Sequence, residues 1–357
     1  MAIIARAPGR VCLFGDHQDY LGLPIIACAI DRYITISGEP NDKDYFEFIL
    51  PDLKEDESVR FRESVRRPTQ NSHLSNAIKV VKRYGCNPDK GYTITITGDI
   101  PINAGLSSSS AVVVAWVQWL LYTFNCDHEI TQRFIGQLAY EAEVLENNSS
   151  GGKMDQFTSA IGGTIFLETD HASHHTSLTH EITGLIIGVS GVPKDTEGLL
   201  GDLKGNQQRV IDKVRKADSN FTIATATIDD FEVHKHMLSG DEQRFLYAAI
   251  KNHLITKEAY IRFRESVLSP TELGKLMTAH HTILKDFLKI TVPRIDAMIA
   301  AALEAGAYGA KIVGSGGGGS ICALAPEGKE QHIITAIKNA GAIDAYHARV
   351  SKGVTIL

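Results

Sequence analysis

One segment near the end of the first third of the chain combines a glycine turn, four serines and a long apolar run. It reads Pro101-Ile-Asn-Ala-Gly105-Leu106-Ser107-Ser108-Ser109-Ser110-Ala111. From Ala111 to Tyr122, Gln118 is the one residue with an amide or charged side chain. An apolar run without a polar face predicts a helix that is buried on all sides. The chain must therefore fold around this helix, which should begin at the serines.

The start of this predicted helix is suited to bind a phosphate. A helix N-terminus offers unpaired N–H groups and a partial positive charge, and Gly105 lets the backbone approach an anion closely. Serine hydroxyls can add hydrogen bonds or a magnesium ligand. The alternative is a simple helix cap, for which one serine is enough. The segment is not a P-loop of the GxxxxGK[ST] type, because no Gly-Lys-Ser follows a strand here.

Composition limits the classes of protein that the chain can belong to. Its 357 residues favour two domains. A net charge of −6 argues against a large nucleic-acid surface, although a local anion site stays possible. No apolar run reaches the ~18 residues of a membrane span, and the first residues lack a cleavage signature. The five cysteines form no CxxC pair, which disfavours zinc sites and disulfides and favours a reducing cytoplasm.

Hydrophobic periodicity predicts an α+β protein with a helix-rich second half. Glycines between residues 191 and 205 indicate a transition, so we expect one domain over residues 1–192 and another over 193–357. Strands are expected at residues 3–4, 11–14, 33–36, 92–97, 164–167, 185–189, 311–313, 320–324 and 347–356. Helices are expected at residues 71–84, 130–146, 207–217, 241–265, 273–288, 295–305 and 329–340.

A polar segment near the N-terminus, Pro8-Gly9-Arg10-Val-Cys-Leu-Phe-Gly15-Asp16-His17-Gln18-Asp19-Tyr20, follows a predicted strand. Asp16 and Asp19 could accept hydrogen bonds from the hydroxyls of a polyol, and Arg10 is a fixed charge suited to a transferring phosphoryl group. A solvated turn explains the same composition equally well.

Two glycine-containing segments complete the candidate set. In Ser149-Ser-Gly151-Gly152-Lys-Met-Asp155-Gln-Phe157, the aspartate taken alone is more typical of a turn or a helix cap than of a catalyst. The run Gly314-Ser-Gly316-Gly317-Gly318-Gly319 lies between two apolar strands. Such a loop is typical of a close approach by another backbone or a ligand, whereas a flexible linker is the alternative.

These four segments, in this order, resemble the kinase superfamily named after galactokinase, homoserine, mevalonate and phosphomevalonate kinases (GHMP). The middle motif, Pro101-x-x-x-Gly105-Leu106-x-Ser108-Ser109, is specific, and the resemblance extends from Pro8 to Leu324. The segments Gly9-Arg10…Gly15-Asp16-His17-x-Asp19-Tyr20 and Met154-Asp155-Gln156 point to the galactokinase-like branch. The implied fold has an N-terminal ribosomal-protein-S5-domain-2-like domain and a helix-rich, ferredoxin-like C-terminal domain.

The resemblance also implies roles for individual residues, with ATP and Mg²⁺ as cofactors. Arg10 and Asp155 would be catalytic, Arg10 by stabilising charge on the transferring phosphate and Asp155 as a base or orienting group. Ser109 and Glu143 would bind the magnesium ion. The nucleotide would contact Gly105, Leu106, Ser107, Ser108, Ser109, Ser110, Gly316 and Gly317, and the sugar would contact Asp16, His17, Asp19, Tyr20 and Gly152.

The position of Glu143 on an ideal helix conflicts with its implied role. At ~100° per residue, Glu143 falls opposite the stripe formed by Ile130, Phe134 and Leu138, which predicts a solvated surface charge. The sequence also departs from galactokinases: Asp16 stands where they usually carry Glu, Gln18 replaces their usual Thr, and their Tyr-Asn-x-Arg-Arg segment is missing near Gly205–Arg209.

We therefore expect an ATP-dependent kinase that phosphorylates a free monosaccharide at the anomeric hydroxyl. The alternatives within the superfamily are a kinase for D-glycero-D-manno-heptose or its phosphate, and a mevalonate kinase. A non-catalytic sugar sensor on the same fold is a third alternative. The protein is expected in the cytoplasm as a monomer or homodimer, without a nucleic-acid or membrane partner.

Overall fold

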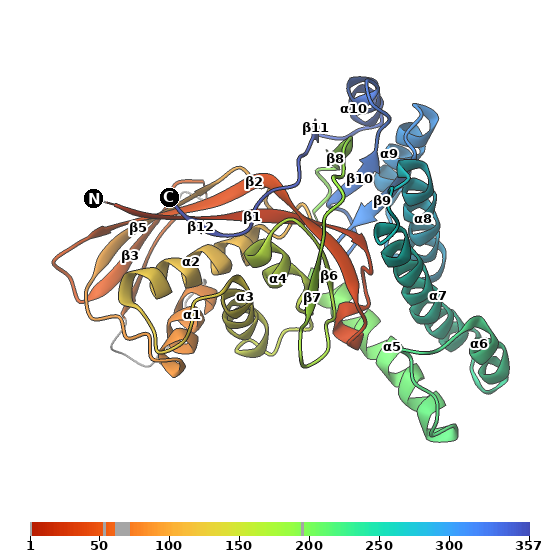
Figure 1. The fold of residues 1–357 in the computed structure, drawn as a ribbon, viewed down its shortest axis with the longest axis horizontal. Helices are drawn as coiled ribbons and strands as arrows, with labels where there is room; N and C mark the ends of the chain where they lie inside the picture. The colour runs from red at the N-terminus through yellow and green to blue at the C-terminus, as the bar shows by residue number, and fades with distance from the viewer. Residues whose placement is uncertain (1, 53–54, 61–71, 194–195) are drawn as a thin grey trace.

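Two β-sheets organise the chain in the computed structural model, which describes residues 2–52, 55–60, 72–193 and 196–357 (Figure 1). Within these residues, one sheet has eight strands and the other has four. Helices cover one face of the large sheet, and further helices lie beside the small one (Figure 1). The expected α+β class is confirmed.

The large sheet is built mostly from the first half of the chain, in the order β12-β1-β2-β5-β3-β4. The strand β6 pairs with β2, and β7 pairs with β6. All of these pairs are antiparallel except β3 with β5. The strands are β1 (Ile3–Phe14), β2 (Ile25–Pro40), β3 (Tyr45–Leu50), β4 (Glu55–Arg60), β5 (Tyr92–Gly98), β6 (Thr164–Leu167), β7 (His175–Leu178) and β12 (Thr355–Ile356).

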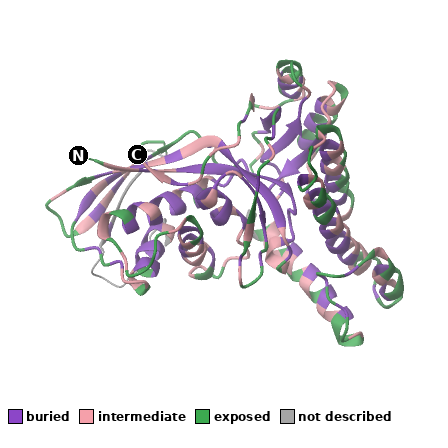
Figure 2. Ribbon diagram, in the orientation of Figure 1, coloured by how far each residue is buried: buried purple, intermediate pink, exposed green. Residues whose placement is uncertain are grey.

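The helices of the first half pack beneath this sheet around α2 (Ser108–Phe124) (Figure 1). The prediction of a buried apolar helix is confirmed for most of its length, although Tyr122 is exposed. Most of α2 is drawn in the colour of buried residues in Figure 2. Trp116 and Trp119 are fully buried and stack with ring centroids 5.3 Å apart. The surrounding helices are α1 (Ser72–Arg83), α3 (Gln132–Tyr140) and α4 (Met154–Ile161). Asn71, the expected first residue of α1, lies outside the described residues.

The second sheet is fully antiparallel, in the order β11-β8-β10-β9. Its strands are β8 (Leu185–Val189), β9 (Gly309–Val313), β10 (Ser320–Leu324) and β11 (Asp344–His347). The helices of this half are α5 (Thr196–Ala217), α6 (Ile228–His234), α7 (Gly240–Phe263), α8 (Pro270–Thr282), α9 (Pro293–Glu304) and α10 (Glu330–Asn339). Within the described ranges, none of the helices has the length and apolarity needed to span a bilayer.

The strand pairing crosses the expected division at residue 192. The strand β8 comes before that point but belongs to the small sheet, and β12 comes from the end of the chain but pairs with β1. The division into residues 1–192 and 193–357 stays a prediction. The single strand expected at 347–356 is wrong, because β11 ends at His347 and the chain then crosses to the large sheet.

The glycines between residues 191 and 205 do not form an extended linker. The helix α5 already begins at Thr196 and includes Gly198, Gly201 and Gly205, whereas residues 194–195 lie outside the described residues. Each internal glycine costs a helix about 1 kcal/mol relative to alanine. Leu203 of this helix is 5 % exposed, and burial of its side chain offsets part of this cost.

The helix expected at residues 130–146 is also modified. The α-helix α3 ends at Tyr140, and a π-helical segment, η2 (Glu141–Leu145), follows it. A π turn adds one residue to the hydrogen-bonded ring and therefore rotates all later side chains relative to an ideal α-helix. As a result Leu145, at the end of this segment, does not continue the buried face of the helix and is 52 % exposed.

Candidate active site

The predicted catalytic residues meet at the start of α2. Arg10 lies in β1, and its guanidinium Nε and Nη2 contact Asp155 Oδ1 at 2.8 and 2.7 Å. Nη1 of Arg10 donates to the carbonyl of Gly105 at 2.5 Å. Asp155 stands in the first turn of α4 and is still 29 % exposed, whereas the Arg10 side chain is 5 % exposed. A carboxylate fixed by a buried arginine therefore faces the serine loop while keeping access to solvent.

Ser107 connects this ion pair to the serine loop. It occupies the N-cap position of α2 in the left-handed region, with φ 61°, and makes no side-chain cap hydrogen bond. Its hydroxyl instead donates to Asp155 Oδ2 at 2.5 Å. The simple cap is therefore wrong for Ser107, and the first N–H groups of α2 have no intrahelical partner. Ser109 is exposed and Ser108 is half-buried, so both can be reached from solvent.

Ser110 and Glu143 are hydrogen-bonded to each other, close enough to Asp155 for its charge to act on Glu143. Burial raises the pKa of Glu143, against the effect of hydrogen bonds from Gln156 and Ser110, and the charge of Asp155 raises it further. The amide of Gln156 donates to Glu143 Oε2 at 2.6 Å. Glu143 is half-buried and bonded to Gln156, so the solvated surface position that we expected for it is wrong; the π-helical segment η2 rotates the helix at this point.

The turn that follows β1, residues 16–20, holds most of the residues predicted to bind the acceptor, and we call it the acceptor turn. Asp19 approaches Gly152 so closely that a Cβ on Gly152 would lie 2.0 Å from Asp19 Oδ2. Burial and the nearby charge of Asp155 raise the pKa of Asp19 to about 6. The hydroxyl of Tyr20 donates to Gln207 of α5 at 2.7 Å. His17 contacts Tyr20 through Nδ1 at 3.2 Å. The turn, the Gly152 segment and Asp155 thus form one continuous wall.

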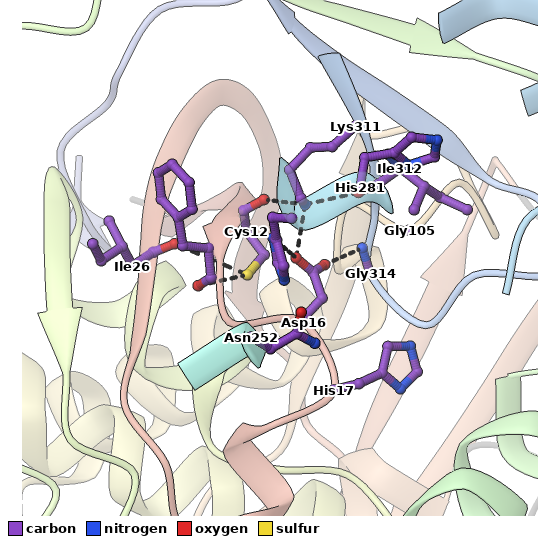
Figure 3. Close-up of polar contacts among 12 residues, drawn as sticks. Cys12, Asp16, His17, Ile26, Gly105, Asn252, His281, Lys311, Ile312 and Gly314 are labelled. Atoms are coloured by element: carbon purple, nitrogen blue, oxygen red, sulfur yellow. Dashed lines mark hydrogen bonds and ion pairs between the residues drawn. The ribbon is translucent and has the colours of Figure 1, made fainter. Parts of the chain in front are cut away.

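Asp16 needs a correction, because the structure buries it away from this wall. Its side chain is 1 % exposed. Oδ2 accepts a hydrogen bond from Lys311 Nζ at 2.7 Å, and Oδ1 accepts one from the backbone N–H of Gly314 at 2.8 Å (Figure 3). We therefore remove Asp16 from the predicted sugar-binding set.

The glycine loop between β9 and β10 packs against the serine loop, as expected. A Cβ on Gly314 would lie 3.1 Å from the carbonyl oxygen of Gly105, and a Cβ on Gly319 would lie 3.0 Å from that of Ala104. Both glycines have a positive φ, 80° and 77°, which favours glycine. Gly316 and Gly317, the two glycines predicted to contact the nucleotide, pack against Ile290 rather than against the serine loop. Gly317 N–H donates to Ile290 O at 2.7 Å, and a Cβ on Gly316 would lie against Ile290.

Several residues that sequence reasoning missed line the back of the acceptor turn. Gln207 carries no motif, and its contact with Tyr20 joins residues 187 positions apart. Lys311 stands within a buried strand, and a lysine between apolar neighbours was the available signal. Asn252 of α7 is fully buried and lies close to Asp16 and His17 in Figure 3. Among the described residues, no group of three or more His, Cys, Asp or Glu side chains is arranged to hold a metal.

Comparisons with known proteins agree with this arrangement. Residues 72–163 match the GHMP kinases N terminal domain, residues 263–343 match GHMP kinases C terminal, and residues 1–40 match the galactokinase galactose-binding signature. A mevalonate kinase of Thermococcus sibiricus is 30 % identical, covering 96 % of this chain and 94 % of that protein. A galactokinase of Haemophilus influenzae is also 30 % identical, with coverages of 92 % and 86 %.

The fold agrees as well. The crystal structure of Lactococcus lactis galactokinase complexed with galactose superposes with a TM-score of 0.89 at 21 % identity, covering all of this chain and 95 % of the other. The predicted two-domain fold is therefore confirmed. With these matches over the whole length and the serine loop against Asp155, the chain belongs to the GHMP kinases and is an ATP-dependent kinase of small molecules.

Proposed function

We propose that this kinase transfers the terminal phosphoryl group of ATP to a hydroxyl of a free monosaccharide, at the anomeric position. The observation that carries the proposal is the geometry of the acceptor turn. Asp19 lies against Gly152 and is close enough to Asp155 for the charge of Asp155 to raise its pKa. The galactose-binding signature over residues 1–40 supports a sugar as the acceptor. Its Asp16 does not, because both carboxylate oxygens are engaged inside the protein.

In the proposed reaction, Asp155 orients the acceptor hydroxyl and accepts its proton. The oxygen then forms a bond to the terminal phosphorus, the bond to the bridging oxygen breaks, and ADP leaves. Arg10 offsets the negative charge that this transfer moves. Phosphoryl transfer depends mainly on positioning and electrostatics, and both residues are held by contacts shorter than 3 Å.

The nucleotide phosphates would rest on the loop from Gly105 to Ser109, with Ser110 supporting Glu143 from within. Mg²⁺ would be held by Ser109 and Glu143 together with the phosphates, where it neutralises charge. Mg²⁺ in kinases commonly uses one or two protein ligands besides phosphates and water. The carboxyl groups of Asp19, Glu143 and Asp155 lie around the cation Arg10, and this concentration of acidic groups favours a divalent cation here.

The sugar would contact Asp19, Tyr20 and the backbone at Gly152. His17, predicted with them, is 4 % exposed and contacts Tyr20 and the carbonyl of Ser315 through its two ring nitrogens, so it would position the turn. The five cysteines are unpaired, which supports the expectation of a reducing compartment such as the cytoplasm. A monomer or homodimer stays a prediction.

A mevalonate kinase is the second candidate. Six mevalonate kinases of Thermococcus and Pyrococcus are 27–30 % identical to this chain over more than 90 % of their lengths. Lys204 of α5 donates to the carbonyl of Ser150 at 3.4 Å, and it is a cation that could serve an anionic acceptor.

The two candidates are separated by a coupled assay of ADP release with ATP, Mg²⁺ and one acceptor at a time. The panel contains galactose, other free hexoses, a heptose, their phosphates and mevalonate, and the product is identified by phosphorus NMR. We expect turnover with a free sugar and an anomeric phosphate signal. Turnover with mevalonate alone would overturn the sugar-kinase proposal, and turnover with none would favour a sensor.

A further inference from the structure

A lysine is fully buried at the junction of the two sheets. Lys311 of β9 has no exposed surface. Its Nζ donates to Cys12 O at 2.9 Å, to Asp16 Oδ2 at 2.7 Å and to Ile312 O at 2.7 Å (Figure 3). An ammonium group has three donors, so these contacts use all of them. Lys311 therefore offers nothing further to a ligand.

Its partner, Asp16, ties the acceptor turn to the glycine loop. Besides the bond from Lys311, Asp16 accepts a hydrogen bond from the N–H of Gly314, which lies at the start of that loop. The next residue of the turn, His17, contacts the carbonyl of Ser315 through Nε2 at 3.1 Å. Consecutive residues of the turn are thus bonded to consecutive residues of the loop.

The glycine loop in turn contacts the serine loop, as the close approach of Gly314 to Gly105 shows. A continuous set of contacts therefore leads from the acceptor turn through Asp16 and Gly314 to the loop that begins α2. The same pair also fixes β1, because Lys311 bonds the carbonyl of Cys12.

The electrostatics indicate that the pair is charged. Burial alone would lower the pKa of Lys311 and raise that of Asp16. Their attraction for each other, together with His280 and the Gly314 N–H beside Asp16 and with Cys322 and Cys12 beside Lys311, outweighs burial, so the pKa of Lys311 is raised and that of Asp16 is lowered. A buried ion pair is often no more stabilising than an apolar pair of similar size. Its directional bonds, however, fix the relative position of the segments that it joins.

We propose that Lys311 and Asp16 are positioning residues for phosphoryl transfer, which set the separation between the acceptor turn and the nucleotide loop. The inference rests on the proposed function only in where it places the acceptor. The transfer requires the reacting atoms within about 3–3.5 Å of each other. A shift of the turn would therefore slow the chemical step without removing any group that touches a substrate.

The decisive variant is the double substitution Asp16→Asn with Lys311→Met, which leaves no unpaired buried charge and nearly conserves volume. Lys311→Met alone would leave the buried carboxylate of Asp16 without its cation, so this variant serves only as a comparison. The matched control is Lys285→Met with Asp296→Asn, an ion pair of 3.1 Å on the outer helices whose members are 44 % and 30 % exposed.

We expect the folded double variant to lose about 30- to 100-fold in kcat, while KM for ATP and for the acceptor changes less than about threefold, the pattern of lost transition-state positioning. The control should keep the wild-type kcat. An unchanged kcat would overturn the proposal. A large rise in the acceptor KM at constant kcat would also overturn it, because it would mean that Asp16 touches the sugar.

A second measurement does not depend on turnover. Hydrogen exchange of the backbone amides at His17–Tyr20 and Gly314–Ser315 reports whether the turn and the loop are still joined. We expect faster exchange in both segments of the double variant and no change in the control. Protection equal to the wild type in either segment would refute the positioning role, even if no acceptor had been identified.

Discussion

At the scale of single residues, the contact between Arg10, Asp155 and Ser107 is the centre of the molecule's chemistry. Arg10 and Asp155 are 145 positions apart in the sequence and only 2.7 Å apart in space. Burial acts to lower the pKa of Arg10, but the adjacent Asp155 outweighs it and raises that pKa. Arg10 therefore stays cationic, which keeps the carboxylate at one place.

Replacing Asp155 by asparagine tests this centre. Asp155→Asn keeps the shape and a hydrogen-bond acceptor for Ser107 but cannot take a proton. We expect turnover to fall ~100-fold or more, the scale of a lost general base, while ATP binding measured by calorimetry persists. Asp89→Asn, at an exposed position, is the control. A variant that turns over at the wild-type rate would show that Asp155 acts only in structure.

Asp19 should make stability depend on pH. Its pKa of about 6 in the folded chain exceeds the value of about 3.9 in an unfolded chain. Between pH 4 and 6 the folded state therefore binds more protons than the unfolded state. The contribution of Asp19 to stability therefore falls as the pH rises through this window, by about 2 kcal/mol in total, whereas the lowered pKa values of the buried His280 and His281 act in the opposite direction.

The neutral variant Asp19→Asn should remove this dependence. In the absence of ligands, we expect its melting temperature at pH 7 to exceed that of the wild type, and we expect the difference between the two proteins to grow as the pH rises from 4 to 6. The acceptor affinity should fall, because a hydrogen-bond acceptor of the sugar site is weakened. Scanning calorimetry across the pH window checks the prediction, and an unchanged slope would contradict it.

At the scale of elements, the π-helical segment η2 decides which carboxylate enters the site. Glu143 accepts a hydrogen bond from Gln156 and lies close enough to Asp155 to sense its charge. Its neighbour Glu141 accepts a hydrogen bond from Tyr84 at 2.9 Å and lies near Arg83. Two glutamates on one short segment thus point to different environments, which provides a matched pair for mutation.

Glu143→Gln should weaken the binding of Mg²⁺ to the site, whereas Glu141→Gln should leave it unchanged. We expect the magnesium concentration for half-maximal activity to rise about 10-fold in Glu143→Gln, because a charged ligand of the ion is replaced by a neutral one. Titration of activity against Mg²⁺ at saturating ATP measures the effect. Equal responses of the two variants would exclude Glu143 from the metal site.

At the scale of the whole molecule, the end of the chain connects the two sheets, because β11 pairs in the small sheet and β12 in the large one. After β11 the chain returns to the large sheet, where Ser351 N–H donates to Ala29 O at 2.9 Å and Gly163 N–H donates to Ser351 O at 2.7 Å. Val354 is 4 % exposed, and the N–H of Leu357 donates to Ile4 O at 2.9 Å. The last seven residues therefore complete a sheet whose other strands come almost entirely from the first half.

Deletion of residues 351–357 should destabilise the protein although none of them lies in the site. The loss of several backbone hydrogen bonds, each contributing about 1 kcal/mol, and of the buried Val354 predicts about 3–5 kcal/mol in total. Urea unfolding monitored by tryptophan fluorescence checks this value. Removal of Leu357 alone, which is 62 % exposed, is the control and should cost much less. Equal stabilities of the two deletions would contradict the role of this segment.

Local chemistry determined much of the protein from its sequence alone. The run from Ala111 to Tyr122 is apolar on all sides of a helix, and such a helix is stable only when it is buried. Composition and period therefore predicted α2. The glycines of the terminal loop predicted a close backbone approach, because only they adopt positive φ without strain. The order of the four motifs then indicated the kinase family and its fold.

Tertiary structure alone decided which polar groups meet. Asp16 was expected to face a sugar, yet Lys311, 295 positions away, captures its carboxylate. Glu143 was expected in solvent, yet it is half-buried on the π-helical segment and bonded to Gln156. Neither outcome can be read from spacing, because hydrogen-bond partners and the register of a helix depend on what packs against them. The sequence determines the local conformations and the motif order, whereas long-range packing selects the partners of each charge.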